Sequence, residues 1–486
     1  MKTGFRFFGS IFLSIIVIAL GMVGCKNPGG SNHWTENHVV TFNPNGGNWS
    51  GSTDPITETV VWNTTVSAPT TDPARSGFTF AGWYTAATGG SLFNFSDPIT
   101  ATTTLYARWR YFAGGTGTAG DPYQIADSAQ FALLAEVINS NTADTANGEN
   151  FNSSAKYYKL TADIYLNTGT AGYATWGTTP PANSWTPIGD NHTNANSSRF
   201  TANFIGDGKK VYGIYINSSD SYNGLFGYVT GVIENTGIEQ SYIKSTGNYT
   251  GGLAGYIYGS SISRINNCYN SGIVSGAGYT GGVAGYVNST NVTNCYNTGS
   301  VTGAGNTGGV AGYVSSTNVT NCYNTGSVTG TGNNIGGMAG FVTTGTTYMT
   351  NCYNTGNVSG VSYVGGIAGM AINSCKITNC YNRGTVTGTT YVGGVAGEVQ
   401  NNSTSLYYCY WLSGTAVQAM GAGNQSLTTV VSFNSGGTLS SSVTIGGTQT
   451  TLLGALNGWV ANHTVTAPTG VTYKTWTGTP YPTLSP

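Results

Sequence analysis

Apolar residues recur at a fixed interval over the second half of the chain, in short pieces separated by glycine and asparagine. Successive glycine pairs start 27 to 30 residues apart, and a cysteine follows each pair. The pairs start at Gly251, Gly281, Gly308, Gly336, Gly365 and Gly393. An earlier, degenerate unit without the cysteine starts at Asn223. A period of this length predicts a solenoid, in which each unit buries its apolar face against its neighbours.

Each unit divides into three strand-like pieces, which read "GGVAGYV", "TNVTNCYN" and "GSVTG" in the best-conserved copies within this chain. Helical repeats are excluded, because glycine and β-branched residues at this density are unfavourable in helices. Three short strands joined by tight corners form one coil of a parallel β-helix, with successive coils about 4.8 Å apart. The pattern therefore predicts an all-β fold built around a parallel β-helix.

Stacked coils place equivalent residues above one another, so each repeated position becomes a column. Val292 and Cys295 can both point inward only if the chain turns a corner at Thr293-Asn294, since flat strands alternate their faces. Asparagine tolerates the left-handed conformation of such a corner, and stacked amides can bond each other. We expect a corner ladder of Asn267, Asn294, Asn321, Asn351 and Asn379. We expect an interior column of Cys268, Cys295, Cys322, Cys352, Cys380 and Cys409.

The tyrosine after each cysteine is expected to point outward. These residues form a possible ligand-binding column of Tyr269, Tyr296, Tyr323, Tyr353 and Tyr381. Exposed aromatic rings can stack on sugars, and asparagine amides can bond hydroxyl groups. A ladder required for stacking has the same sequence pattern as a ladder used for binding, so the sequence alone does not separate the two roles.

Both ends of the solenoid carry helix signals. Asp127 and Gln130 fit a capping box before a helix over 128–139, whose apolar face is Phe131, Leu134 and Ile138. Near the C-terminus, "TTLLGALNGWVANH" predicts a second short helix and "YKTWTGTPYPTLSP" an extended closing segment. Because a solenoid's end coils expose unpaired backbone, we expect these segments to act as caps.

The N-terminus has the pattern of an export signal. Lys2 and Arg6 precede the apolar run "IFLSIIVIAL", and small residues lead to Cys25. The sequence "GMVGC" resembles the lipobox of bacterial lipoproteins, which implies a signal peptide over 1–24, lipidation of Cys25 and a lipidated linker over 25–37. Lys26 favours outward export to the outer membrane or cell surface. A plain signal peptide with an incidental cysteine is the alternative.

Two further stretches have family resemblances. The segment 38–110, with "GWY" and "LYARW", resembles an internalin-type B repeat, the Listeria–Bacteroides repeat, which implies a small β-grasp-like module. The later units, with "GLFG" and "GLAG", resemble GLUG-motif repeats of bacterial surface proteins. The resulting division is an N-terminal cap of the β-helix over 111–222, GLUG-like repeats over 223–411 and a C-terminal cap over 412–486.

The content of charged residues and cysteines argues against several classes of function. Charged residues make up 7% of the chain and its net charge is −1, so nothing predicts binding of nucleic acid. With Cys25 lipidated, the other cysteines are odd in number and are expected to be mostly reduced. The spacing favours neither a metal site nor a cofactor. Between Thr250 and Trp411 the only acid is Glu398, whereas polysaccharide-cleaving enzymes use paired carboxylates.

The sequence therefore favours a non-enzymatic, lipid-anchored, adhesin-like surface protein. Its partners would be the membrane, through the N-terminal lipid, and a host or neighbouring-cell glycan or protein. The alternative is a structural spacer of the cell envelope without a ligand of its own. A polysaccharide-cleaving enzyme is the least favoured hypothesis.

Overall fold

A computed structural model describes residues 36–75, 78–87, 90–140, 150–190, 198–259, 263–344, 347–400, 404–423, 427–463 and 472–485. The predicted signal peptide, Cys25 and most of the linker over 25–37 lie outside the described residues. Within the described residues, no helix has the length and apolar character needed to cross a membrane.

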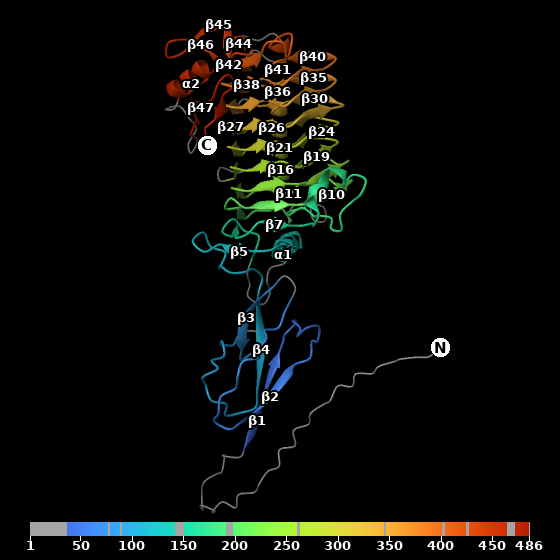
Figure 1. The fold of residues 1–486 in the computed structure, drawn as a ribbon, viewed down its shortest axis with the longest axis vertical. Coiled ribbons are helices and arrows are strands. Elements are labelled where there is room, and N and C mark those ends of the chain that lie inside the picture. The colour runs from blue at the N-terminus through green and yellow to red at the C-terminus, as the bar shows by residue number, and fades with distance from the viewer. Residues whose placement is uncertain are drawn as a thin grey trace, which may run out of the picture.

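Alternating apolar residues in the first module form a four-stranded sheet with the strand order β2-β1-β4-β3. Its strands are β1 (Asn37–Asn43), β2 (Ile56–Val61), β3 (Thr79–Tyr84) and β4 (Thr103–Arg110). Val40, Phe42 and Leu105 are buried in its core. In the turn after the first strand Asn45 has a φ of 46°. The module lies at the N-terminal end of a rod of stacked coils (Figure 1).

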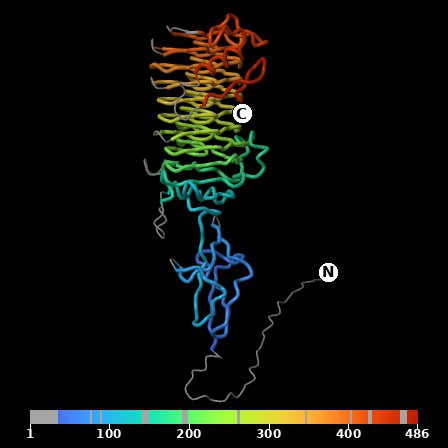
Figure 2. Tube along the Cα trace, turned by 90° about the vertical axis from the view of Figure 1, so that its left-hand side faces the viewer, coloured from blue at the N-terminus to red at the C-terminus, as the bar shows by residue number. Residues whose placement is uncertain are grey.

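The repeats form a parallel β-helix, which confirms the predicted fold class (Figures 1 and 2). One sheet follows the "AGY" piece: β11 (Phe226–Val229), β16 (Ala254–Tyr258), β21 (Ala284–Asn288), β26 (Ala311–Ser315), β31 (Ala339–Thr343), β36 (Ala368–Ala371), β41 (Ala396–Val399) and β43 (Met420–Gly423). We call it the AGY sheet. A second, the TGG sheet, precedes it in each coil: β15 (Thr250–Gly251), β20 (Thr280–Gly281), β25 (Thr307–Gly308), β30 (Asn333–Gly336), β35 (Ser362–Gly365) and β40 (Thr390–Gly393).

A third sheet follows the cysteine-containing piece, and we call it the NCYN sheet. Before the corner it contains β8 (Asn203–Ile205), β12 (Val232–Glu234), β17 (Arg264–Asn266), β22 (Asn291–Thr293), β27 (Asn318–Thr320), β32 (Tyr348–Thr350) and β37 (Lys376–Thr378). After the corner it contains β9 (Lys210–Tyr212), β13 (Gly237–Glu239), β18 (Tyr269–Asn270), β23 (Tyr296–Asn297), β28 (Tyr323–Asn324), β33 (Tyr353–Asn354) and β38 (Tyr381–Asn382). The first coils add β5 (Tyr123–Ile125), β6 (Tyr157–Leu160) and β7 (Ile164–Tyr165), and the coil after β37 and β38 adds β42 (Ser405–Leu412).

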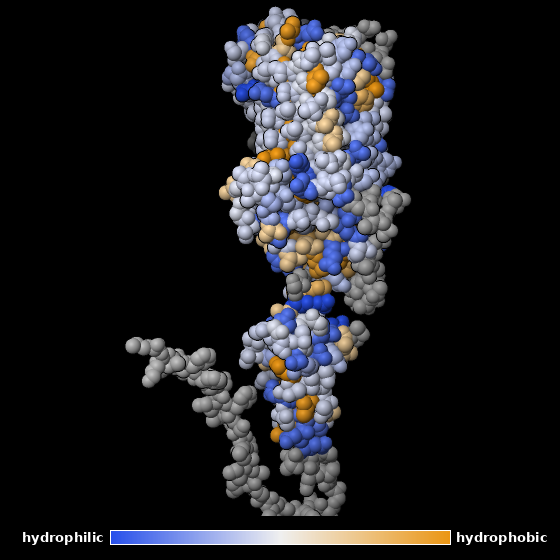
Figure 3. All heavy atoms as spheres, turned by 90° about the vertical axis from the view of Figure 1, so that its right-hand side faces the viewer, coloured by the Kyte–Doolittle hydropathy of each residue, from blue (hydrophilic) through white to orange (hydrophobic). Residues whose placement is uncertain are grey.

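The fourth sheet follows the "SVTG" piece, and we call it the SVTG sheet. Its strands are β10 (Tyr215–Ser218), β14 (Tyr242–Ser245), β19 (Ile273–Gly276), β24 (Val301–Gly303), β29 (Val328–Gly330), β34 (Val358–Ser359) and β39 (Val386–Thr387). The side of the molecule that includes it is pale over most of the rod in Figure 3, where strongly hydrophilic and hydrophobic residues are scattered. Outward positions of the SVTG sheet, such as Thr302, Thr329 and Thr387, are exposed and uncharged.

The interior is filled by aligned apolar columns. Val283 and Val287 of one coil, and their counterparts Val310 and Val314 in the next, are at most 1% exposed. Each coil thus closes a section of core that it cannot bury alone, which is why the sequence must repeat.

The N-terminal end is capped by α1 (Ser128–Asn139), as the sequence predicted. Asp127 Oδ1 accepts a hydrogen bond from the Gln130 backbone N–H at 2.8 Å, and Gln130 Oε1 accepts one from the Ala126 N–H at 2.8 Å. Phe131 and Ile138 are fully buried on the predicted face.

The parallel stacking continues one coil beyond Trp411, where the sequence repeat ends. β43 pairs with β41, and β44 (Leu427–Phe433) pairs in parallel with β42. Position 411, the end of the predicted GLUG-like repeats, is therefore where the sequence repeat ends and not where the last coil ends. Parallel backbone pairing can continue because it does not require the repeated side chains. β45 (Thr438–Thr444), β46 (Thr448–Thr451) and α2 (Leu452–His463) follow, and then β47 (Trp476–Thr477) and β48 (Thr483–Leu484).

Candidate functional site

The predicted corner asparagines occupy the corners of the NCYN sheet. All five have φ between 52° and 59°, the left-handed conformation that a corner needs. Asn351 donates from Nδ2 to Asn321 Oδ1 at 2.8 Å, and Asn379 donates to Asn351 in the same way at 2.8 Å. Asn321 donates to Asn294 Oδ1 at 3.2 Å. Asn294 donates to Asn266 Oδ1 instead, so the ladder is interrupted between Asn267 and Asn294.

The six predicted column cysteines are fully buried beside this corner. All seven cysteines of the described residues are free thiols, and Cys375 is the one outside the column. Burial raises the pKa of the Cys268, Cys322 and Cys380 thiols, and it raises the pKa of Cys375 to about 12. Because all six are fully buried, the column packs as small apolar side chains that solvent does not reach.

We expect soluble protein beginning at Lys26 to show no reaction with Ellman's reagent at pH 8 while folded, because its thiols are buried and the reagent cannot reach them. After denaturation in guanidinium chloride, all seven described thiols should react. Rapid reaction of the folded protein would show that the column is accessible.

The tyrosines after the cysteines stack along the rod. Ring centroids are 4.7 Å apart between Tyr269 and Tyr296, and 4.6 Å apart between Tyr296 and Tyr323, with interplanar angles of 1° and 4°. The faces of each ring therefore lie largely against its neighbours. The outer surface of the column presents ring edges and hydroxyl groups, an arrangement that does not favour sugars stacked on ring faces.

The prediction of an exposed column is wrong for its last two members. Tyr353 is 4% exposed and Tyr381 is fully buried, because the C-terminal segment folds back over them and packs Trp476 against both rings. Tyr269, Tyr296 and Tyr323 remain partly exposed. In Figure 2 the red C-terminal segment crosses the coils nearest the C-terminal end of the rod and stops before the green ones.

A second asparagine ladder, not predicted from the sequence, lies inside the rod. Its members are fully buried: Asn270, Asn297, Asn324, Asn354 and Asn382. Asn297 Nδ2 donates to Asn324 Oδ1 at 2.9 Å and to the Gly299 carbonyl at 2.7 Å, and the other members repeat this pattern. The signal was the asparagine of each "CYN" triplet, which must face inward if the preceding tyrosine faces outward.

A tyrosine patch on the AGY side was also missed. It consists of Tyr222, Tyr228, Tyr249, Tyr256, Tyr279, Tyr286, Tyr313 and Phe341, all partly exposed. Within its longer column Tyr256, Tyr286 and Tyr313 stack with centroids 4.7 and 4.5 Å apart. Rings of the shorter column, such as Tyr249 and Tyr279, meet these rings nearly at right angles, at 78° to 90°. The result is a herringbone of rings without a charged member.

Burial also raises the pKa of the stacked phenols, to about 12 for Tyr256 and for Tyr323. A phenol whose pKa is higher in the folded than in the unfolded protein stabilises the fold below the unfolded pKa of about 10, and that stability is lost at higher pH. We expect the urea midpoint to be insensitive to phenol ionisation up to about pH 9 and to fall above about pH 10. Absorbance at 295 nm should show these phenols ionising later than free tyrosine; ionisation of every tyrosine near pH 10 would contradict the stacking.

The acids at the N-terminal end of the NCYN sheet are engaged by cations. Glu239 lies 2.8 Å from Lys210 Nζ and accepts a hydrogen bond from the Tyr269 hydroxyl. Although burial acts against it, these hydrogen bonds hold the pKa of Glu239 below its usual value. Asp207 lies 2.9 Å from Lys159. Among the described residues, no group of three or more His, Cys, Asp or Glu could hold a metal ion.

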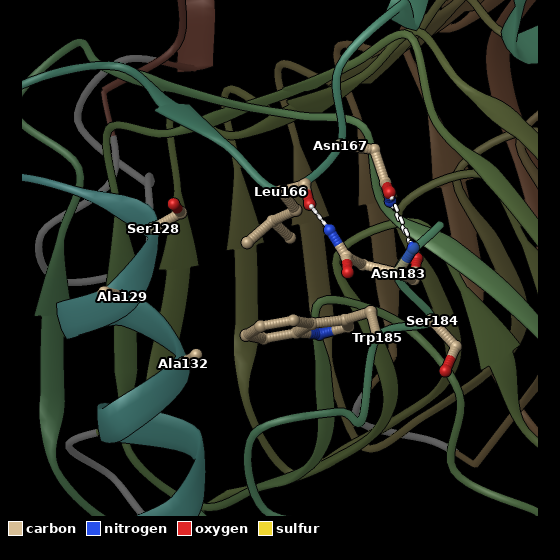
Figure 4. Close-up of a pocket in the computed structure, with 8 residues that line it drawn as sticks. All are labelled: Ser128, Ala129, Ala132, Leu166, Asn167, Asn183, Ser184 and Trp185. Atoms are coloured by element: carbon tan, nitrogen blue, oxygen red, sulfur yellow. Dashed lines mark hydrogen bonds between the residues drawn. The ribbon is translucent and has the colours of Figure 1, made fainter. Parts of the chain in front are cut away.

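A pocket of about 310 Å³ lies between α1 and the segment around Trp185. Figure 4 shows the indole extending toward α1, where Ala129 and Ala132 leave the space open. Trp185 Nε1 donates to the Leu225 carbonyl at 3.0 Å, and its ring stacks on Phe131. The indole is thus tied into the cap, and only part of its apolar surface faces the pocket.

Comparison with known families supports the two repeat types. Residues 38–108 match the Listeria-Bacteroides repeat domain, and residues 360–387 match the GLUG motif. The chain therefore carries both repeat families.

A further relative matches only part of the chain. A protein of Evansella cellulosilytica, provisionally named Gly-rich membrane protein, is 31% identical over 157 residues, which cover 30% of this chain and 15% of that protein. The chain thus spans only a small part of this relative's length.

Two solved structures share parts of the fold. One, from Bacteroides ovatus and provisionally described as an immunoglobulin A1 protease, has a TM-score of 0.43 and 21% identity over 77% of this chain and 95% of its own. The other is described as IgA1 Protease and has a TM-score of 0.39 and 14% identity over 78% of this chain and 29% of its own. Likeness at this level says nothing about activity.

Proposed function

We propose that this chain is an exported, lipid-anchored protein of the cell envelope, adhesin-like, that binds a host or neighbouring-cell glycan or protein through its β-helix without catalysis. The observation that carries this proposal is the tyrosine patch. Monomeric proteins seldom expose large apolar surfaces without a function, and tyrosine is enriched where proteins bind partners. Eight partly exposed aromatic rings gathered on one side of a rod are more than coil stacking requires.

The phenols of the patch suit a neutral partner. The raised pKa of Tyr256 keeps its hydroxyl protonated at any physiological pH, so it can donate as well as accept hydrogen bonds. No charged side chain belongs to the patch, and Arg199 stands at one end of it, over the ring of Tyr228. Binding would therefore depend little on ionic strength.

The anchor would be Cys25, with acyl chains holding the protein at the outer membrane or cell surface. Cys25→Ser should move the protein from the membrane fraction to the soluble fraction and abolish incorporation of radiolabelled palmitate. Unchanged membrane association and labelling would contradict lipidation at this residue.

The binding role is tested with soluble protein starting at Lys26 and a shorter form starting at Tyr111, applied to whole cells and to glycan and protein arrays. Saturable binding retained by the shorter form supports recognition by the β-helix. Binding lost with residues 26–110 would assign recognition to the first module instead. No binding by either folded protein would favour the spacer hypothesis.

A further inference from the structure

The C-terminal segment shows what kind of ligand the corner ladder can hold. Asn321 Nδ2 donates to the Thr472 carbonyl at 2.7 Å, and Asn321 Oδ1 accepts from the Lys474 backbone N–H at 3.2 Å. The Lys474 carbonyl accepts in turn from Asn351 Nδ2 at 2.9 Å. One asparagine amide thus bonds the backbone of alternate residues, as a neighbouring β-strand would.

An aromatic side chain completes this contact. Trp476 is 2% exposed and donates from Nε1 to Asn351 Oδ1 at 2.7 Å. Its ring centroid lies 5.7 Å from that of Tyr353 and 5.6 Å from that of Tyr381, with the planes inclined at about 60° to each other. The face therefore holds an extended peptide by its backbone and by an aromatic residue two positions after Lys474.

The same face continues on coils that the described part of the segment, 472–485, does not reach. Asn294 and Tyr296 are the counterparts of Asn321 and Tyr323 one coil earlier. Asn294 uses one N–H toward Asn266 and one lone pair toward Asn321. Because an amide has two N–H groups and two lone pairs, one N–H group and one lone pair of the Asn294 amide remain available. In Asn321 the corresponding N–H group and lone pair are the ones that bond Thr472 and Lys474.

Exposure follows the position of the tail. Asn351 and Asn379 are fully buried and Asn321 is 2% exposed, whereas Asn294 is partly exposed and Asn267 is exposed. Among the described residues, the C-terminal segment contacts the corner ladder from Asn321 onward. The coils containing Asn267 and Asn294 therefore present the same groups without this cover.

We infer that this open face, formed by Asn267, Asn294, Tyr269 and Tyr296, binds an extended segment of a partner protein that carries an aromatic side chain, an inference that rests on the proposed binding role. Stacked rings leave few faces for sugars, whereas the corner amides match the alternating N–H and C=O groups of a strand. The tyrosine edges receive the partner's aromatic ring, as Tyr353 and Tyr381 receive Trp476.

The test uses a fluorescein-labelled peptide of Thr472–Ser485 as the partner strand, titrated with the full chain from Lys26 and followed by fluorescence anisotropy. The open-face variants are Asn294→Gly, which keeps the left-handed corner without the amide, and Tyr296→Ala. Tyr391→Ala is the matched control, since it removes an exposed tyrosine, stacked on Tyr363, that lies outside both the open face and the tyrosine patch. Urea unfolding of each variant verifies that it is folded.

We expect saturable peptide binding that weakens at least tenfold in both open-face variants, is kept by Tyr391→Ala and is lost with a Trp476→Ala peptide. Binding unaffected by the open-face variants would overturn the inference, since the peptide would then be displacing the chain's own tail. Absence of peptide binding, or Tyr296-dependent binding of a neutral glucose hexasaccharide in its place, would also overturn it. Array binding that survives in either case would leave the proposed function standing.

Discussion

Trp476→Ala in the full chain should cause the last coils to unfold at a much lower urea concentration than the rest of the rod. The side chain is 2% exposed, packs against Tyr353 and Tyr381 and donates to Asn351. Replacing a buried tryptophan by alanine costs about 3–5 kcal/mol. Urea unfolding followed by tyrosine nitration and mass spectrometry should show a lower midpoint and new nitration of Tyr353 and Tyr381.

The matched control is Val417→Ala, because Val417 is fully exposed near the same end of the rod. Its unfolding midpoint should equal that of the wild type. If Trp476→Ala left Tyr353 and Tyr381 protected from nitration, the tail would not be the cover that the structure shows.

Gly282→Ala should strongly destabilise the repeats. A methyl group at Gly282 would lie 2.2 Å from the Gly309 carbonyl oxygen and 2.3 Å from Asn297 Cγ. Neither can move freely, since that carbonyl accepts the Gly282 N–H and the Asn297 amide is bonded within the interior ladder. We expect a loss of about 3 kcal/mol or more in the free energy of unfolding, measured by urea denaturation.

Gly172→Ala provides the comparison, because a methyl group there meets no atom within 4 Å and the residue lacks a positive φ. This change should be neutral or slightly stabilising. Equal effects of the two substitutions would mean that the second glycine of each pair is not required by the interior ladder.

Most of the fold could be predicted because the sequence of a solenoid repeats once per coil, so that equivalent positions reveal the strands and corners of the coil. The three-residue step from Val292 to Cys295 requires a corner, and Asn294 has the expected left-handed φ of 56°. The same alternation would also have predicted the interior ladder, since Asn297 follows the outward Tyr296. The general rule that polar side chains lie at the surface argues against a buried asparagine. Stacking overrides this rule here, because it lets buried amides satisfy each other.

The candidate surfaces were harder to predict. The tyrosine patch joins Tyr249, which precedes the "TGG" piece, to Tyr256 in the next strand, and their right-angled contact depends on coil geometry. The burial of Tyr381 depends on a segment about a hundred residues later in the chain. The Tyr381 hydroxyl donates a hydrogen bond to the Pro482 carbonyl of that segment. Contacts between a repeat and a non-repeated tail leave no periodic signal, so repetition alone indicated an exposed column.

The binding role of the rod is tested most directly by comparing wild-type protein from Lys26 with Tyr256→Ala/Tyr286→Ala on whole cells and on glycan and protein arrays. Tyr391→Ala, which removes a 46% exposed tyrosine outside the tyrosine patch, serves as the control. We predict saturable binding by the wild type and the control, and at least a tenfold loss in the folded double variant. Undiminished binding by the double variant would contradict recognition through the tyrosine patch.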